Sequence, residues 1–360
     1  MDEHKEISLR YLFFNFLKIG SISWGGFMAL VSVIRSQMVE RDKTVSDETI
    51  LDGISLASVL PGPLAFNVVT YLGYKLRGIK GALVSMVAII LPSFLMILAL
   101  AAVYARYGQV SFFRNFFAGI LPAVAAVIIS VAVDMFRKQV KDVKQGTVCV
   151  LACLALIFLH SFWITLLTIL LGAAFGVAMY QQPGTEVTGN HAPKGHSLNP
   201  GMWIYPIAGA FVILLILLPS LIDMGERSRF LQTIFLTFSG MSLTLFGGGY
   251  VIIPAMQQVI VDGFHWLTTN EFADAIAMGQ ITPGPIFISA TFIGFRIAGF
   301  AGALIATIAV FFPPGLVMIA LSGFMGTIRK STLITAAFKG MRPAIIGMIF
   351  SAAWTIGKGA

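Results

Sequence analysis

Long apolar stretches separated by short polar connections dominate this chain. Each stretch is long enough to enter a lipid bilayer, and together they predict about 10–11 membrane segments. The longest polar connection, 181–199, contains Gly, Pro, Thr, Asn, His and Lys and reads as a linker. In chain order the apolar stretches are 9–34, 52–76, 81–105, 112–136, 147–160, 162–180, 202–222, 230–254, 272–297, 302–325 and 333–356.

The pattern of the first four stretches returns in the last four. Pro61 and Pro283 lie 222 residues apart (283 − 61 = 222), and after the loss of one residue Pro122 and Pro343 lie 221 apart (343 − 122 = 221). Other residues that keep these spacings are Phe13 with Phe235, Gly25-Gly26 with Gly247-Gly248, Asp52 with Asp274, Gly73 with Gly294, and Pro92 with Pro313. Two related halves with interruptions at matching positions are typical of secondary transporters.

This repeat divides the chain into three parts. We expect a first repeat at 9–145, connecting membrane segments at 146–229 that include the linker, and a second repeat at 230–360. The pair of short stretches within 146–180 suits either two thin spans or one helical hairpin. The fold class is therefore an all-α integral membrane protein built from two repeats.

Each repeat contains one Pro-Gly-Pro string, at 61–63 and at 283–285. Two prolines remove backbone donors and disfavour helical geometry in the preceding residue, which predicts a broken helix or a hairpin there. A new helix would begin at Leu64 and at Ile286. The N–H groups of its first turn, with the positive end of the helix dipole, are suited to binding an anion.

The repeats are expected to have inverted topology. If every stretch spans the bilayer, seven precede the second copy, and an odd number inverts it. The positive-inside rule favours this arrangement, with a cytoplasmic N-terminus. If the Pro-Gly-Pro segments instead return to the side they entered from, the charge bias is smaller and places the N-terminus outside.

Composition excludes several classes of protein. The chain is 57% hydrophobic and 11% charged, with a mean hydropathy of +0.88 and a net charge of +8. In a membrane protein such an excess marks cytoplasmic loops, and no basic stripe points to a nucleic-acid partner. The histidines lie at loops and ends, away from matching carboxylates, and no phosphate-binding G-x-x-x-x-G-K-[ST] string occurs. We expect no catalytic residue, metal or cofactor.

The candidate substrate-binding residues gather around the interruptions. Glycine pairs allow backbone N–H groups to face a ligand, although they also suit close helix packing. An intramembrane lysine indicates function, although Lys18 could instead extend to the interface. Asp52 and Asp274 are interpreted as helix caps. The candidate set is Lys18, Ser23, Gly25, Gly26, Gly62, Pro63, Asn67, Gly247, Gly248, Gln280, Thr282, Gly284, Pro285 and Ser289.

These motifs resemble a known family. Ser23-Trp24-Gly25-Gly26 and its echo Phe246-Gly247-Gly248-Gly249, combined with the two Pro-Gly-Pro strings, resemble the chromate ion transporter family in its two-domain form. The resemblance covers about 13–133 and 235–356. It implies a bacterial inner-membrane protein that expels chromate, and it implies that sulfate, of the same tetrahedral shape, competes.

The sequence thus predicts a multi-pass secondary transporter that exports a small oxyanion, driven by the membrane potential or an ion gradient. Two alternatives remain open, a membrane-embedded lipid-phosphate enzyme and a passive anion channel. The expected partners are the oxyanion and the lipid bilayer, and association of two chains as a homodimer is left open.

Overall fold

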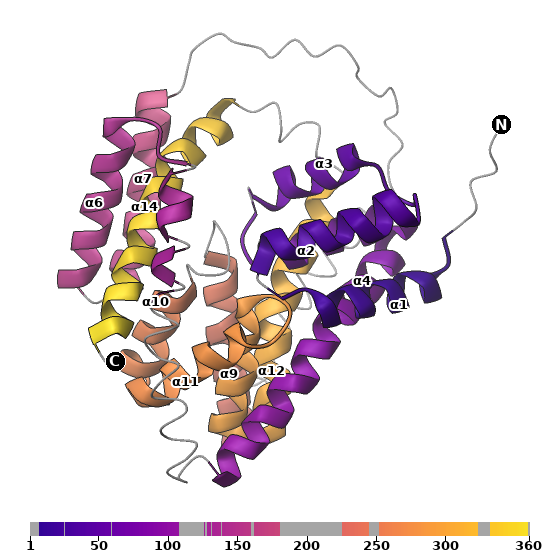
Figure 1. Ribbon diagram of the computed structural model, residues 1–360. Helices are drawn as coiled ribbons and strands as arrows, with labels where there is room; N and C mark the ends of the chain where they lie inside the picture. The colour runs from indigo at the N-terminus through magenta and orange to yellow at the C-terminus, as the bar shows by residue number, and fades with distance from the viewer. Residues whose placement is uncertain are drawn as a thin grey trace.

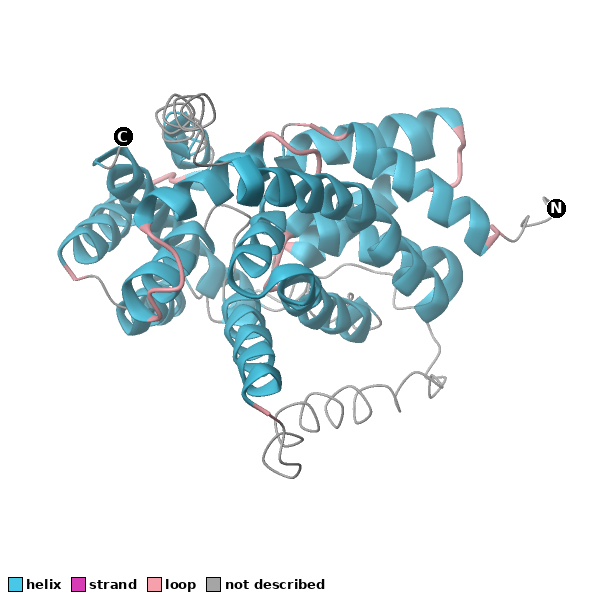
Figure 2. Ribbon diagram, turned by 90° about the horizontal axis from the view of Figure 1, so that it is seen from below, coloured by secondary structure: helices cyan, strands magenta, loops and turns pink. Residues whose placement is uncertain are grey.

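The chain is helical wherever its structure is described. The computed structural model describes residues 7–24, 26–58, 60–107, 126, 128–130, 132–137, 139–159, 162–180, 225–244, 252–322 and 332–358. Within these ranges helices alternate with short connections and no residue lies in a strand, which confirms the all-α prediction (Figure 2). Two helical stretches there, Leu64–Tyr107 and Ile286–Ser322, are long and apolar enough to cross a membrane.

The described helices of the two repeats follow the same order, except that the second has one additional short helix, η5 (Figure 1). The first comprises α1 (Leu9–Ile22), α2 (Gly26–Ile34), the π-helix η1 (Arg35–Arg41), α3 (Asp47–Ala57) and α4 (Leu64–Tyr107). The second comprises α9 (Glu226–Thr244), α10 (Ile252–Met256), the π-helix η4 (Gln257–Gly263), α11 (Thr269–Gln280), the 3₁₀-helix η5 (Ile286–Ile288) and α12 (Ser289–Ser322). The other described helices are α6 (Val143–Phe158), α7 (Phe162–Tyr180) and α14 (Thr332–Lys358).

The two sequence repeats also have matching backbone conformations. The π-helices η1 and η4 begin 222 residues apart (257 − 35 = 222) and each has seven residues. Lys43 and His265, at the same spacing, both have a positive φ, of 50° and 53°. Both long helices are interrupted at matching glycines, since Gly78 has φ 59° and ψ −148° and Gly299 has φ 64° and ψ −151°.

Each repeat begins with a pair of antiparallel helical arms, which we call the glycine hairpin. In the first, the Tyr11 hydroxyl donates to the Asp42 carboxylate at 2.5 Å and the Lys18 ammonium donates to Gln37 Oε1 at 3.3 Å. Both pairs bracket the glycine pair, so α1 and η1 run in opposite directions. In the second, the rings of Phe230 and Trp266 lie 5.7 Å apart in the same relation to the second glycine string.

This arrangement differs from the sequence prediction of one interrupted segment at 9–34. Residues 9–34 are predominantly apolar, so hydropathy alone reads them as one long segment. The helix α1 has 14 residues, about 21 Å at 1.5 Å per residue, which is less than the ~30 Å hydrocarbon thickness of a bilayer. One arm is therefore too short to span.

The helices on either side of each Pro-Gly-Pro string also lie side by side, and we call this unit the proline hairpin. A Cβ on Gly53 would lie 2.8 Å from Cδ1 of Tyr71, although these residues are on opposite sides of the first string. Across the second string, Arg296 forms an ion pair with Glu271. Since the paired residues are nearly equidistant from the prolines, the two arms run antiparallel and the string forms the tip.

After each proline hairpin the chain doubles back into the long part of α4 or α12. Gly73 packs against the backbone of Gly81, and Gly294 packs in the same way against Gly302. Eight residues along a straight helix would be about 12 Å apart, so these contacts require the turn at the interrupting glycine. Only glycine permits such close approach of two backbones.

The helices α6, α7 and α14 lie together at one side of the molecule (Figure 1). The Tyr180 hydroxyl at the end of α7 donates to the Asp142 carboxylate at the start of α6, at 2.6 Å, so α6 and α7 form a helical hairpin. This hydrogen bond lowers the pKa of Asp142. For residues 146–180 the sequence alone is compatible with two thin spans or with one helical hairpin. Gly340 of α14 packs directly on the backbone of α7 at Gly176.

The turn after each proline hairpin generates a stability prediction. Changing Gly302→Ala places a methyl group against the Gly294 carbonyl, an overpacking that we expect to cost about 1–3 kcal/mol. Gly240→Ala in α9 is the control, because nothing lies within 4 Å of its Cβ position. The apparent unfolding temperature in detergent should fall for the first variant and stay level or rise for the second. Equal temperatures would contradict the backbone contact.

Candidate functional site

The tip of each proline hairpin packs against the long helix of the other repeat. Gly62 and Gly284 occupy the two tips with φ of 96° and 105°, a conformation that disfavours any side chain. A Cβ on Gly62 would collide with Pro314 of α12, and a Cβ on Gly284 would collide with Ser93 of α4. Each tip is therefore seated on the long helix of the other repeat.

The two seats are related by the repeat itself. Ser93 and Pro314 are 221 residues apart (314 − 93 = 221) and each directly follows a matching proline. The contacts of Gly62 with Pro314 and of Gly284 with Ser93 are thus one contact made twice, with the repeats exchanged. The rings of Phe66 and Phe311, whose centroids lie 5.1 Å apart and whose planes are tilted by 54°, add to this inter-repeat packing.

Two hydrogen bonds hold the second tip in place in addition to its packing against Ser93. The Gly284 N–H donates to the Ser23 carbonyl at 3.1 Å, which joins this tip to the end of α1 in the first glycine hairpin. The Ser93 hydroxyl donates to the Pro283 carbonyl. At the first seat Pro314 has no hydroxyl, so the two halves of the site differ in strength.

Asn67 and Ser289 are the polar side chains that follow the tips at matching positions (289 − 67 = 222), and both are fully buried. Asn67 Nδ2 donates to the Pro61 carbonyl across the tip at 2.9 Å. Its Oδ1 and the Ser289 hydroxyl have no hydrogen-bond partner within the described residues. A buried polar group without a partner costs about 1–3 kcal/mol, so a ligand or water that supplied one would be stabilised there.

The first turns after the two tips have different geometries. The Asn67 N–H donates to the Pro63 carbonyl at 2.9 Å, an α-helical bond, so the N–H groups of Leu64 to Phe66 precede any intrahelical acceptor. After the second tip the Ile288 N–H donates to the Pro285 carbonyl at 3.0 Å, and this turn is the 3₁₀-helix η5. The first tip is therefore the better source of unsatisfied donors.

Other candidate side chains near the tips bond to their own helices. The Ser23 hydroxyl donates to the Ile19 carbonyl at 2.6 Å, and the buried Thr282 hydroxyl donates to the Met278 carbonyl at 3.1 Å. Gln280 is the last residue of α11 and is partly buried beside the second tip. These residues lie beside the second tip, but the hydroxyls of Ser23 and Thr282 are already engaged.

The remaining candidates are less well connected to the tips. Lys18 lies on an exposed face of α1, where it pairs with Gln37 of the same glycine hairpin. Gly26 is the first residue of α2. Gly25, Gly247 and Gly248 lie outside the described residues.

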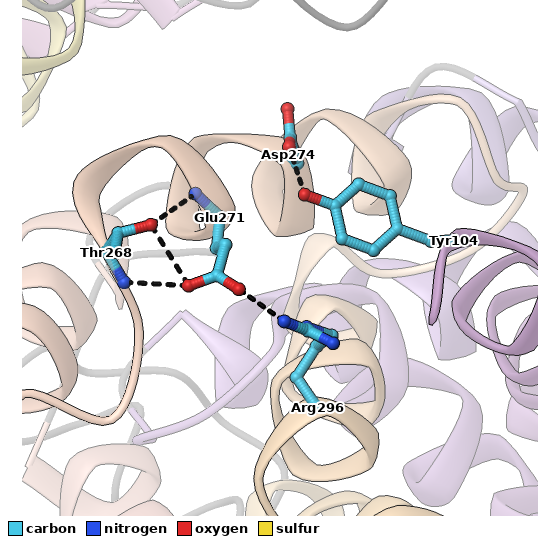
Figure 3. A network of polar contacts seen from close by, with 5 residues as sticks. All are labelled: Tyr104, Thr268, Glu271, Asp274 and Arg296. Atoms are coloured by element: carbon cyan, nitrogen blue, oxygen red, sulfur yellow. Dashed lines mark hydrogen bonds and ion pairs between the residues drawn. The ribbon is translucent and has the colours of Figure 1, made fainter. Parts of the chain in front are cut away.

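Sequence reasoning missed Ser93 and Pro314, and it misread Asp52 and Asp274. The signal for the seats was present, because each follows a repeated proline. The interpretation of the aspartates as helix caps is wrong, since Ser46 and Thr268 cap α3 and α11. Asp274 instead lies within α11, 9% exposed, and accepts a hydrogen bond from Tyr104 at 2.7 Å (Figure 3).

Comparison with known proteins gives one consistent family. The family described as Chromate transporter matches residues 10–177 and 232–360. A probable chromate transport protein of Synechococcus elongatus is 32% identical over 99% of this chain and 86% of its own length. The chromate transport protein of Cupriavidus metallidurans is 30% identical over 98% of this chain and 83% of its own. No solved structure matches the chain.

The seat of the first tip can be tested against a matched glycine. Gly62→Ala introduces both backbone strain, about 1–3 kcal/mol, and a collision with Pro314. Gly78→Ala introduces strain alone, because its φ is also positive but nothing lies within 4 Å of its Cβ position. We expect Gly62→Ala to lower the apparent unfolding temperature clearly further. Equal losses would mean that the tip does not rest on α12.

Proposed function

The chain belongs to the chromate transporter family, and we propose that it is a secondary transporter that exports chromate across the bacterial inner membrane. Membership makes it a membrane transport protein rather than an enzyme, so the lipid-phosphate enzyme is set aside. The observation that carries the proposal is the reciprocal packing of the two proline hairpin tips, Gly62 on Pro314 and Gly284 on Ser93, each on the long helix of the other repeat.

The tips have the chemistry that a dehydrated oxyanion needs. Helix first turns present N–H groups and a positive dipole end, worth about 0.3–1 kcal/mol per charge at exposed sites and more when partly buried. The buried Ser289 hydroxyl, which has no partner among the described residues, adds a hydrogen-bond donor beside the second tip. Backbone donors recognise a tetrahedral shape rather than one element, so we propose that sulfate competes with chromate.

We propose that the two repeats have inverted topology. The first proline hairpin ends at Arg77, where the long part of α4 begins. Near the other end of α4, Tyr104 bonds to Asp274 in the second proline hairpin. Residues 79 and 104 are separated by about 38 Å along the helix, at 1.5 Å per residue. This supports proline hairpins that enter from opposite membrane faces and meet between them.

The distribution of basic residues supports a cytoplasmic N-terminus. With inverted repeats and both hairpins of the first repeat returning, one membrane face collects the clusters Arg35–Lys43, Lys75–Lys80 and Arg137–Lys144. The opposite face collects few, among them Arg106 and Arg296. The positive-inside rule assigns the richer face to the cytoplasm, and the N-terminus lies on it.

Export needs no ATP on this account. A charge moving through the membrane potential gains about 2.3 kcal/mol per 100 mV, so a dianion leaving an inside-negative cell gains about 4–5 kcal/mol. The buried contacts of Gly62 and of the second tip favour a carrier over a passive channel. An ion can pass between the tips only after they separate from their seats, and such a rearrangement limits the rate of each cycle.

Flux through liposomes tests the proposed function. Vesicles that contain the purified protein and labelled chromate should release it with saturating kinetics, and faster when a potassium diffusion potential makes the lumen negative. Excess sulfate should slow the release. Absence of chromate and sulfate flux at every potential would contradict the proposal, and flux that rises linearly with concentration would indicate a channel.

A serine pair tests whether the anion binds at the tips. Ser289→Ala should raise the KM for chromate severalfold, because it removes one hydrogen bond worth about 0.5–1.5 kcal/mol to the bound ion. Ser85→Ala is the matched control, since its hydroxyl is equally buried and has no partner among the described residues, but lies against Gly73, away from the tips. A KM that changes equally in both variants would place the anion elsewhere.

The role of Lys18 in gathering the anion can be tested by substitution. If the exposed ammonium helps to gather the anion, Lys18→Ala should raise the KM for chromate and make the flux less sensitive to salt, since exposed charges are screened. Gln37→Ala removes its partner but leaves the charge, and should have little effect. An unchanged KM for Lys18→Ala would show that Lys18 does not help to gather the anion.

A further inference from the structure

Tyr104 connects the two repeats at one end of the molecule. It lies near the end of α4, in the first repeat, yet its contacts are with the second proline hairpin (Figure 3). Its hydroxyl donates to Asp274 Oδ2 at 2.7 Å, its ring lies 5.2 Å from that of Phe292, and the Arg296 guanidinium lies over the ring at 5.6 Å. Both arms of that hairpin therefore hold this side chain.

The surroundings keep the acceptor in place. Arg296 is also ion-paired to Glu271, so one residue binds both the ring of Tyr104 and the first turn of α11. Glu271 completes a capping box with Thr268 at the start of that helix. The charged group that acts on Asp274 is thus Glu271 on its own helix, and Tyr104 supplies the hydrogen bond from α4 (Figure 3). Arg296 on α12 pairs with Glu271 and lies over the Tyr104 ring.

The two repeats differ in sequence at the position of Tyr104. The counterpart of Asp274 is Asp52, but the residue that matches Tyr104 in the second repeat is Met325 (325 − 104 = 221). A methionine has no hydroxyl to donate, so the exchanged contact cannot form with the same chemistry. The central seats, by contrast, occur in both copies.

We propose that the Tyr104–Asp274 hydrogen bond is the gate contact at the end where the second proline hairpin enters, and that it breaks whenever this end opens. The proposal rests on the proposed transport function, because it assigns one side of an alternating cycle. Separation of the proline hairpin from α4 would have to remove Tyr104 from Asp274, Phe292 and Arg296 together. Tyr104 is in this sense a positioning residue, which acts on access to the tips and does not itself touch the anion.

Accessibility of one buried position tests the gate. Met278 lies on α11 between Asp274 and the second tip and is 1% exposed, and its counterpart Leu56 in α3 is also 1% exposed. We would replace Cys149 and Cys153 by alanine, introduce Met278→Cys or Leu56→Cys, and measure the rate of labelling by a polar maleimide in liposomes. Each cysteine is then combined with Tyr104→Phe or with Asp274→Asn.

The expected result is specific to one end. Tyr104→Phe removes the donor and should raise the labelling rate of Met278→Cys at least threefold, while that of Leu56→Cys stays level or falls. Asp274→Asn keeps a carbonyl oxygen that can accept from Tyr104, so labelling should remain close to that of the parent. Faster labelling of both cysteines, or no change at Met278→Cys, would overturn the gate.

Chromate flux on the same liposomes separates this inference from the proposed function. If the gate account holds, Asp274→Asn should retain flux, whereas an essential proton carrier at this position would lose it. Selective labelling without any chromate or sulfate flux would contradict the proposed substrate but support the gate. Normal flux with unselective labelling would contradict the gate alone.

Discussion

Two glycines pressed against the opposite repeat hold the centre of this molecule together. At Gly62 and Gly284 the backbone turns with a positive φ, and the space that a side chain would fill is occupied by Pro314 and by Ser93. The glycine supplies the turn and the close approach at the same time. The short arms and the turns into α4 and α12 place each tip against the long helix of the other repeat, and polar side chains are buried beside the tips.

A membrane protein can keep such broken backbone only where protein or a wet cavity surrounds it. The reciprocal seats meet this requirement, because each tip is covered by the other repeat's long helix. The same arrangement leaves Asn67 Oδ1 and the Ser289 hydroxyl buried without a partner in the described structure. The Ser289 hydroxyl can donate to an oxyanion, whereas Asn67 Oδ1 is an acceptor that only a donor such as water can satisfy. The unpaired hydroxyl therefore marks the second tip as a place for an anion and not only as a joint between repeats.

The features marked by particular residues, such as the repeats, could be predicted from the sequence. The direction in which neighbouring helices run could not. Two repeats, their offset and the importance of Gly62 and Gly284 could be deduced from matching glycines and prolines. That 9–34 forms two antiparallel arms could not, because a span and a pair of short arms have the same apolar pattern. The seats on Ser93 and Pro314 arise between segments far apart in sequence, and Asp274 resembles a cap until Thr268 is seen to occupy that position.

The most direct test is to locate the anion. Selenate is a tetrahedral dianion of the same shape whose selenium gives an anomalous X-ray signal, and crystals of the protein grown with it would show where it binds. The account predicts a peak between the two hairpin tips, within hydrogen-bonding distance of the first turn of α4 and close to Asn67 and Ser289. A peak confined to the exposed face around Lys18, with nothing between the tips, would contradict it.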